Sequence, residues 1–246
     1  MNLSLAESGQ LADDLVKFGQ VLVRSETTVV LCPTHVALTL VAEKLKNCGM
    51  VNWQLGAQDI FWHEKGAYTG EVSGGELKEA SCRYVLIGHS ERREYLGETD
   101  EMINRKISVA LKTGLTPVVC IGETLDERRE GRADLVIMTQ LAKALQDIEL
   151  TGQQQLLVAY EPIWVIGSGQ AIGRAEAVHT AQVIRQALKD IFERHQSALE
   201  RIQVIYGGSV ESGNVSDFYE ADVLVGVLVG GASLNAQKFI SIVKNY

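Results

Sequence analysis

Short apolar segments alternate with amphipathic segments along the whole chain, and most of the apolar segments stop at a polar residue or at glycines. Parallel strands that are buried on both faces read as continuous apolar runs, whereas the helices that cover them carry apolar residues on one face. The alternation therefore predicts an α/β protein with a parallel sheet covered by helices. The expected strands are Thr27–Cys32, Gln54–Gln58, Tyr84–His89, Thr116–Ile121, Leu156–Tyr160, Arg201–Tyr206 and Val223–Val229.

The expected helices outnumber the strands by one, because the first helix, Met1–Arg24, has no strand before it. Ser4 and Glu7 have the spacing of a capping box at its start. Further helices are expected at about Thr34–Cys48, Glu76–Cys82, Asp100–Thr113, Leu125–Gln146 and Ala175–His195, with one more after each of the last two strands. Such a chain fits either an eightfold strand–helix barrel whose first β-strand is apparently missing or an open doubly wound sheet.

Polar residues at the carboxyl ends of the expected strands favour the barrel. A barrel gathers these ends on one rim, whereas an open sheet spreads them along an edge. The residues at these ends are Gln58, His89, Glu123, Glu161, Gly207-Gly208-Ser209 and Gly230-Gly231. We therefore expect an α/β (β/α)8 barrel that forms one domain over residues 1–246.

The composition allows one large core and argues against several classes of partner. With 246 residues, 46% of them hydrophobic, the chain has the size of a single barrel domain. Its net charge of −8 and its lack of a basic cluster argue against binding to nucleic acid or to an anionic membrane. The four cysteines have no C-x-x-C spacing, which indicates buried thiols rather than disulfides or a zinc site. No apolar run approaches the ~18 residues of a membrane span, so a cytoplasmic protein is expected.

The strand Leu156–Tyr160 ends at Glu161, and Pro162 then terminates it because proline has no backbone N–H to donate. An apolar Ile-Trp-Val-Ile segment and Gly167-Ser168-Gly169 follow, which is typical of a lid with hinge glycines. A carboxylate under an apolar lid has a raised pKa, which suits a general base near neutral pH. The alternative is a structural glutamate in an ordinary loop, since structural groups also have perturbed pKa values.

His89 ends the strand Tyr84–His89, and the Ser-Glu-Arg-Arg that follows is compatible with the start of a helical turn. Helical N–H groups disfavour a charged imidazolium, so His89 is expected to be neutral and to donate a hydrogen bond. The alternative is a histidine that only satisfies buried carbonyl groups.

Two glycine doublets, Gly207-Gly208 and Gly230-Gly231, follow consecutive expected strands. Glycine lets backbone N–H groups approach an anion closely, and barrels hold phosphate at these strand ends. The pair of doublets predicts a phosphate site, although one doublet alone is more often just a turn. The glycines from Gly167 to Gly173 lack the spacing of a dinucleotide fingerprint, and no residue cluster has metal-ligand spacing, so neither a cofactor nor a metal is expected.

Seven motifs in order along the chain resemble those of the triosephosphate isomerase family. They are Gly56-Ala57-Gln58, Tyr68-Thr69-Gly70-Glu71, Gly88–Arg93, Val119–Glu123, Ala159–Trp164 with Gly167-Ser168-Gly169, Tyr206–Ser209 and Leu228–Ser233. One such motif is modest evidence, but seven in order are specific. The resemblance implies a TIM barrel that interconverts dihydroxyacetone phosphate and D-glyceraldehyde 3-phosphate in glycolysis and gluconeogenesis, without cofactor or metal.

The resemblance also implies the residue roles. Glu161 removes a proton from the carbon next to the carbonyl, and His89 donates a hydrogen bond to the oxygen as an ene-diolate forms. Backbone N–H groups bind the phosphate, and they belong to Gly167, Ser209, Gly230 and Gly231. The lid Pro162–Gly169 closes over the substrate and excludes water. The family is usually dimeric, so the resemblance further implies a homodimer through the loop Asp59–Glu71.

The chain departs from the family pattern at its start. The family normally begins with a strand ending in Asn-x-Lys, and this chain starts just past that lysine; Lys17 and Arg24 do not replace it. Losing one preorganised donor costs about 3–4 kcal/mol of transition-state stabilisation. Two alternatives therefore stay open: a catalytically impaired or non-catalytic phosphate-binding barrel, and a purely structural barrel.

Overall fold

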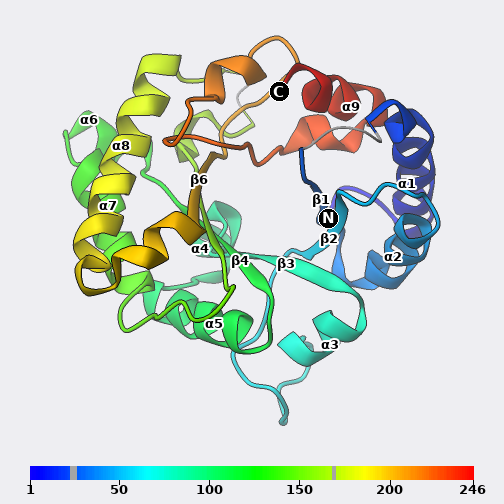
Figure 1. Cartoon of the computed structure of the whole chain (residues 1–246), viewed down its shortest axis with the longest axis horizontal. Helices are drawn as coiled ribbons and strands as arrows, with labels where there is room; N and C mark the ends of the chain where they lie inside the picture. The colour runs from blue at the N-terminus through cyan, green and yellow to red at the C-terminus, as the bar shows by residue number, and fades with distance from the viewer. Residues whose placement is uncertain (23–26, 168–169) are drawn as a thin grey trace.

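The computed structural model describes residues 1–22, 27–167 and 170–246, and its centre is one parallel sheet. The six strands pair in chain order, each with the next, and Figure 1 shows them curving around the middle of the molecule with helices outside. A doubly wound sheet reverses its strand order part-way, so this order argues against that alternative. The strands are β1 (Val29–Leu31), β2 (Trp53–Ala57), β3 (Cys82–Ile87), β4 (Thr116–Ile121), β5 (Leu156–Tyr160) and β6 (Ile202–Tyr206).

Six of the seven expected strands are thus confirmed, and the seventh, Val223–Val229, is not a regular strand. Glu220 and Leu224 form an antiparallel bridge around a tight turn in which Asp222 has a φ of 64°. The turn occupies the start of the expected strand, so only its later part pairs with β6, through an isolated parallel bridge between Tyr206 and Val227. The observed architecture is a curled, parallel, six-stranded α/β sheet.

The helices lie outside the curled sheet (Figure 1). They are α1 (Leu5–Gly19), α2 (Leu38–Lys46), α3 (Gly74–Glu79), α4 (Ser90–Leu96), α5 (Asp100–Lys112), α6 (Leu125–Arg129), α7 (Ala133–Ala144), α8 (Arg174–Ile191) and α9 (Ala236–Asn245). The expected capping box of Ser4 and Glu7 at the start of α1 is confirmed. The expected end of that helix, at Arg24, lies outside the described residues.

Two expected helices differ from the structure for local reasons. The segment Leu125–Gln146 is divided into α6 and α7, because Gly131 has a left-handed φ of 70° that a helix does not accept. The prediction of a helix to Cys82 is wrong, because Ser81 has a φ of 69° and turns the chain into β3. Short 3₁₀ segments extend several elements: Gln20–Leu22, His35–Ala37, Ile163–Val165, Glu193–Arg201, Val215–Phe218 and Gly231–Leu234.

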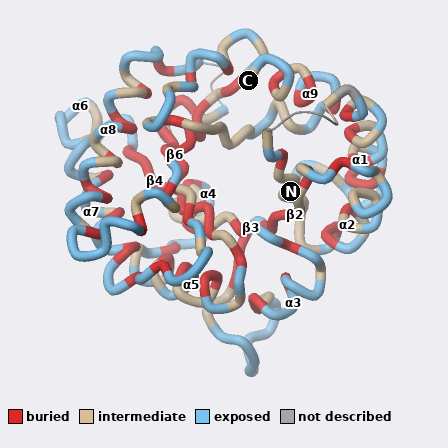
Figure 2. Tube along the Cα trace, in the orientation of Figure 1, coloured by how far each residue is buried: buried red, intermediate tan, exposed pale blue. Residues whose placement is uncertain are grey.

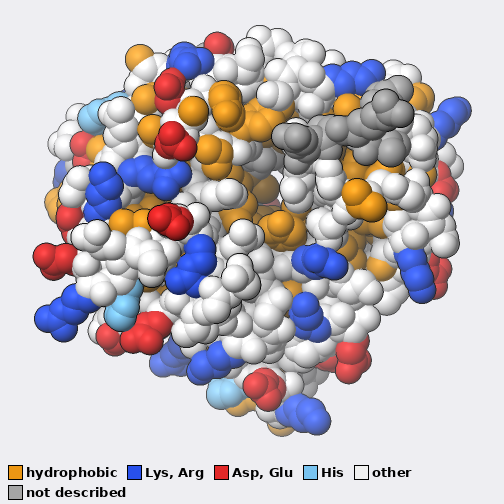
Figure 3. Space-filling view, in the orientation of Figure 1, with side chains coloured by type: hydrophobic (Ala, Val, Ile, Leu, Met, Phe, Trp, Pro, Cys, Tyr) orange, Lys and Arg blue, Asp and Glu red, His pale blue; other side chains and the backbone are white. Residues whose placement is uncertain are grey.

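Buried residues concentrate on the strands and on the inward faces of the helices, as Figure 2 shows. The main hydrophobic cluster lies between the sheet and the helices, and a smaller one fills the inner side of the sheet around Val118, Cys120, Ala159 and Ile205. In the space-filling view of Figure 3, hydrophobic side chains gather around the middle of the drawn face. Within the described residues, no helix is both long and apolar enough to cross a membrane.

Candidate active site

Glu161 follows strand β5 directly and lies in a tightly packed position between the ends of β4 and β6. The Glu161 backbone N–H donates to Ile121 O at 2.7 Å, and the side chain is only 2% exposed. A Cβ on Gly122 would lie 1.7 Å from the carbonyl oxygen of Glu161, and a Cβ on Gly207 would lie 2.9 Å from its Cγ. Both neighbours must therefore be glycine for this carboxylate to occupy its place.

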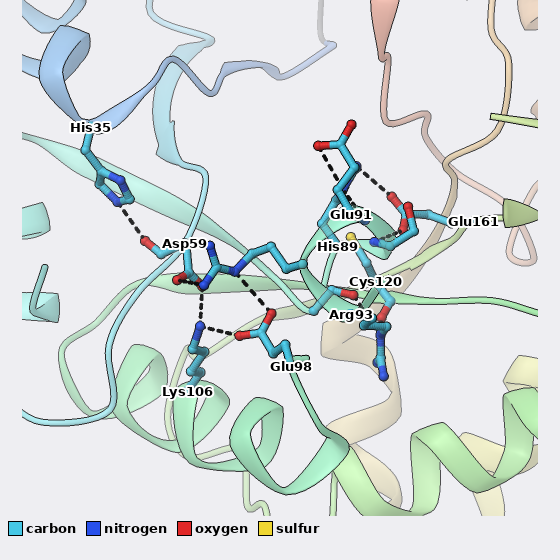
Figure 4. A network of polar contacts seen from close by, with 12 residues as sticks. His35, Asp59, His89, Glu91, Arg93, Glu98, Lys106, Cys120 and Glu161 are labelled. Carbon is cyan, nitrogen blue, oxygen red and sulfur yellow. Dashed lines mark hydrogen bonds and ion pairs between the residues drawn. The ribbon is translucent and has the colours of Figure 1, made fainter. Parts of the chain in front are cut away.

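The Glu161 carboxylate contacts the turn that follows β3 (Figure 4). The backbone N–H of Ser90 donates to Oε2 at 2.9 Å, and Nε2 of His89 lies 3.1 Å from Oε1. Burial raises the pKa of the Glu161 carboxyl, while His89, Ser90 and Cys120 oppose that increase. The site thus contains a desolvated carboxylate with a histidine beside it, as a general base requires.

His89 is the N-cap residue of α4, and its ring is oriented by the backbone. The backbone N–H of Glu91 donates to Nδ1 at 3.3 Å. A neutral imidazole that accepts at Nδ1 carries its proton on Nε2, so the hydrogen bonds assign a donor at the atom that faces Glu161. Arg93 fixes the turn, because it donates to Gly88 O at 2.8 Å and to Cys120 O at 3.1 Å.

Several contacts hold the described part of the expected lid to the neighbouring strand ends, among them a backbone hydrogen bond from Ile163 N–H to Glu123 O at 3.2 Å. Trp164 Nε1 donates to Glu123 Oε1 at 3.0 Å, and the guanidinium of Arg128 lies 4.9 Å from the centre of the Trp164 ring. On the other side, Ser209 Oγ donates to Val165 O at 2.9 Å. The lid therefore bridges the carboxyl ends of β4 and β6.

A second set of charged residues, all buried or half-buried, lies under the same turn (Figure 4). Lys106 Nζ is 2.6 Å from Asp59 Oδ1 and also pairs with Glu98, and Arg92 Nη2 is 2.8 Å from Asp59 Oδ2. Burial raises the pKa of Asp59, against the opposite effect of Lys106 and Arg92. These pairs join the end of β2 to α4 and α5, and they brace the helix whose N-cap is His89.

Known proteins are similar in sequence to this chain over most or all of its length. A model of the triosephosphate isomerase family matches residues 1–246. The triosephosphate isomerases of Thermoanaerobacter pseudethanolicus and Moorella thermoacetica are each 42% identical over 246 residues, which is 100% of this chain and 96% of each relative. That of Dictyoglomus thermophilum is 41% identical over 220 residues, which is 89% of this chain and 86% of the relative.

The chain belongs to the triosephosphate isomerase family. The resemblance carried by the seven sequence motifs is thereby confirmed. Triosephosphate isomerases are aldose–ketose isomerases, and by family this protein is an enzyme of that kind. The family also implies a TIM barrel, of which the curled six-stranded sheet is a large part.

The predicted phosphate residues of the triosephosphate isomerase motifs lie on three segments: the lid, the loop after β6 and the turn after Val223–Val229. Gly207 N donates to Tyr160 O at 2.7 Å, which brings the loop with Ser209 next to Glu161 and to the lid. Gly230 and Gly231 are exposed and begin the 3₁₀ segment that follows the Val223–Val229 segment. Gly167, on the lid, is exposed with a φ of 72°, and Ser168 and Gly169 lie outside the described residues. The roles of these residues stay predictions.

Several contacts of this isomerase site were not assigned from sequence. The sequence identifies Glu123 only as a polar strand end, whereas in the structure it is fully buried and accepts hydrogen bonds from Tyr160 and Trp164. Ser90 binds the Glu161 carboxylate through its backbone N–H, so the type of its side chain does not indicate this role in the sequence. The thiol of Cys120 faces Glu161, and burial raises its pKa well above the usual range. The sequence gives one indication of this orientation. Cys120 lies two residues before Gly122, and every second residue of a strand points to the same face.

Proposed function

We propose that this protein interconverts dihydroxyacetone phosphate and D-glyceraldehyde 3-phosphate through an ene-diolate, with Glu161 as the base. The observation that supports this most strongly is the buried Glu161 carboxylate, which lies 3.1 Å from Nε2 of His89. Burial raises the pKa of Glu161, which increases its basicity relative to an exposed glutamate.

In this proposal Glu161 removes a proton from the carbon beside the substrate carbonyl and returns it to the neighbouring carbon. His89 donates from Nε2–H to the oxygen on which negative charge develops. A neutral donor fits because Nδ1 accepts the Glu91 N–H, so the imidazole need not be charged. The isomerisation consumes no other reactant, because each proton removed is returned to the substrate, and the proton held on Glu161 can exchange with solvent before it returns.

The phosphate is proposed to lie against backbone N–H groups of Gly167, Ser209, Gly230 and Gly231. Glycine-rich turns at consecutive strand ends expose N–H groups to an anion without side chains in between. A Cβ on Gly230 or Gly231 would meet nothing within 4 Å, so the space over both residues is open to a ligand. The hydrogen bond from Ser209 Oγ to Val165 O links the lid to the loop that is proposed to bind phosphate. This link supports a lid that closes when phosphate binds to that loop.

We further propose that the sheet belongs to a closed (β/α)8 barrel and that residues 1–246 form one domain. The Val223–Val229 segment extends the sheet beyond β6 through the bridge between Tyr206 and Val227. In the described residues the outer edge of β1 is unpaired, and one further strand between that edge and this segment would close the barrel. The half-buried side chains on the inner side of the sheet would be covered by closure.

A homodimer through the loop Asp59–Glu71 is also proposed. The loop projects from the body of the molecule (Figure 1), and its rings pack on one another, with Phe61 and Tyr68 centroids 4.8 Å apart. Tyr68 is exposed and Phe61 is half-buried, and aromatic residues are enriched at protein interfaces. Tyr68→Asp should halve the mass in sedimentation, and an unchanged mass would exclude the loop as the interface. Four free thiols are compatible with the cytoplasmic location expected from the sequence.

The catalytic proposal is tested by NMR of the isomerisation in deuterium oxide. The protein should convert either triose phosphate into the other and introduce deuterium at the carbon beside the carbonyl, and Glu161→Gln should slow both reactions by about a hundredfold or more. Glu193→Gln, on an exposed residue far along the chain, is the matched control. A protein that binds 2-phosphoglycolate but neither isomerises nor exchanges would instead be a phosphate-binding barrel.

A further inference from the structure

Gln140 of α7 holds the backbone of Gly122, the residue that follows β4. Its Oε1 accepts a hydrogen bond from Gly122 N–H at 2.9 Å, and its Nε2 donates to Gly122 O at 3.0 Å. A primary amide offers an acceptor and a donor side by side, so it can satisfy both backbone groups of one residue. The ladder between β3 and β4 ends at Ile87 and Val119, and the Gln140 amide therefore replaces a strand partner for the buried Gly122.

The peptide unit between Ile121 and Gly122 links Gln140 to the proposed base. A trans peptide unit is planar and directs its C=O and its N–H to opposite sides. On one side, Ile121 O accepts the backbone N–H of Glu161 at 2.7 Å, and on the other side Gly122 N–H donates to Gln140. Gln140 and Glu161 are thus bound to the same rigid group from opposite directions.

The contact between Gly122 and Glu161 leaves no room for independent movement. A Cβ on Gly122 would lie 1.7 Å from the carbonyl oxygen of Glu161 and 3.3 Å from its Cα. Because protein interiors are close-packed, a displaced Gly122 also displaces the backbone of Glu161. The Glu161 carboxylate lies 3.1 Å from Nε2 of His89, so such a shift changes the geometry between the base and the donor.

We propose that Gln140 is a positioning residue of the isomerase, which fixes the Ile121–Gly122 peptide and through it the place of the Glu161 carboxylate. The amide acts through Gly122, because both of its hydrogen bonds end there. The inference rests on the proposed function, in which Glu161 is the base. The alternative is that Gln140 only satisfies two buried backbone groups, as polar side chains in proteins often do.

Gln140→Met tests the proposal, because methionine has a similar length and lacks the amide. A displacement of about 1 Å can cost about a hundredfold in rate, so kcat should fall by about tenfold to a hundredfold. KM should stay within about twofold, because the proposed phosphate contacts lie on other loops. In the Glu161→Gln background the same change should lower the residual kcat by less than about twofold, since no base is left to misplace.

Gln154→Met is the matched control, because Gln154 also bonds two backbone groups. Its Oε1 accepts from Thr151 N–H at 2.8 Å, and its Nε2 donates to Leu111 O at 2.9 Å. Gln154 precedes β5, at the end of the strand opposite to Glu161. Both variants should lose a similar amount of stability in urea, but Gln154→Met should keep the kcat of the wild type.

Hydrogen exchange provides a measurement that does not depend on turnover. Exchange of the Glu161 backbone N–H, followed by NMR, should be about tenfold faster in Gln140→Met than in Gln154→Met, because its acceptor Ile121 O is no longer fixed. If Gln140→Met does not fold, Gln140→Asn takes its place, since an amide one methylene shorter cannot make both hydrogen bonds to Gly122.

Three kinetic results would overturn the proposal: a wild-type kcat in Gln140→Met, an equal loss in Gln154→Met, or the same loss with and without Glu161. Equal exchange rates of the Glu161 N–H in the two glutamine variants would overturn it as well. A wild type that does not isomerise would contradict the proposed function alone, because the exchange rates would still report whether Gln140 holds the backbone of Glu161.

Discussion

Nε2 of His89 lies 3.1 Å from Oε1 of Glu161, across the boundary between the turn after β3 and the end of β5. The carboxylate is held in place by the backbone N–H of Ser90, which donates to its other oxygen at 2.9 Å. A base and a hydrogen-bond donor are thus positioned by two non-adjacent strands before substrate arrives. Such preorganisation avoids reorganisation during the reaction and is a major source of catalytic rate.

Replacing Glu161 by Gln should reduce kcat by about a hundredfold to ten-thousandfold, the usual contribution of a general base. The amide keeps the size of the side chain but is not basic. KM should change little, because the phosphate contacts lie on other loops. A coupled assay of both reaction directions measures this effect, and a variant that turns over like the wild type would exclude Glu161 as the base.

The pH profile of kcat/KM should show an acidic limb above the ordinary glutamate pKa of 4.5, because burial raises the pKa of Glu161. As the pH falls through that raised pKa, the carboxylate is protonated and can no longer accept a proton. The limb should be absent from the residual activity of Glu161→Gln. An acidic limb at or below 4.5 in the wild type would show that His89 and Ser90 outweigh burial.

The same raised pKa predicts how the free energy of unfolding depends on pH. A carboxyl whose pKa is higher in the folded state binds its proton more tightly there. Its contribution to stability is fully present below the unfolded pKa and is lost as the pH rises through the folded pKa. Glu161→Gln removes this loss, so the variant should be more stable than the wild type at neutral pH and no more stable under acidic conditions. Urea titrations at several pH values measure the difference, and Glu193→Gln, at an exposed position, provides the baseline.

The sequence was sufficient for those features that local patterns encode. Apolar runs located six strands, and the residues at their ends included His89, Glu161 and Ser209. The pattern was misleading where a single backbone conformation decided the structure, as at Ser81 and Asp222, both with left-handed φ angles. An L-residue in that region has no reliable sequence signal, unlike glycine.

Contacts between distant parts of the chain are the second kind of feature that the sequence does not predict. Trp164 and Glu123 are 41 positions apart, and Lys106 and Asp59 are 47 apart. Neither pair follows from helical or strand periodicity, since each depends on how separate strands and helices pack. The family resemblance predicts the residue roles, but the contacts that support those residues are visible only in the folded structure.

Lys106→Met should destabilise the protein by about 3–5 kcal/mol, because it leaves the buried carboxylates of Asp59 and Glu98 without their shared cation. Lys44→Met is the matched control. It breaks a pair of similar length, 2.6 Å to Asp13, but that carboxylate is 55% exposed, so the cost should stay below about 1 kcal/mol. Urea denaturation at neutral pH compares the two. Equal losses would mean that the buried network adds no more than a surface pair.

Gly122→Ala should reduce kcat by about a hundredfold, because an added Cβ would lie 1.7 Å from the carbonyl oxygen of Glu161 and must displace the base. Stability should fall as well, since Glu161 N–H donates to Ile121 O at 2.7 Å and this pairing cannot tolerate the shift. Gly213→Ala adds the same methyl group where nothing lies within 4 Å, so it should change neither quantity. If Gly122→Ala unfolds earlier on heating but keeps the wild-type kcat, the backbone of Glu161 does not set the position of its carboxylate.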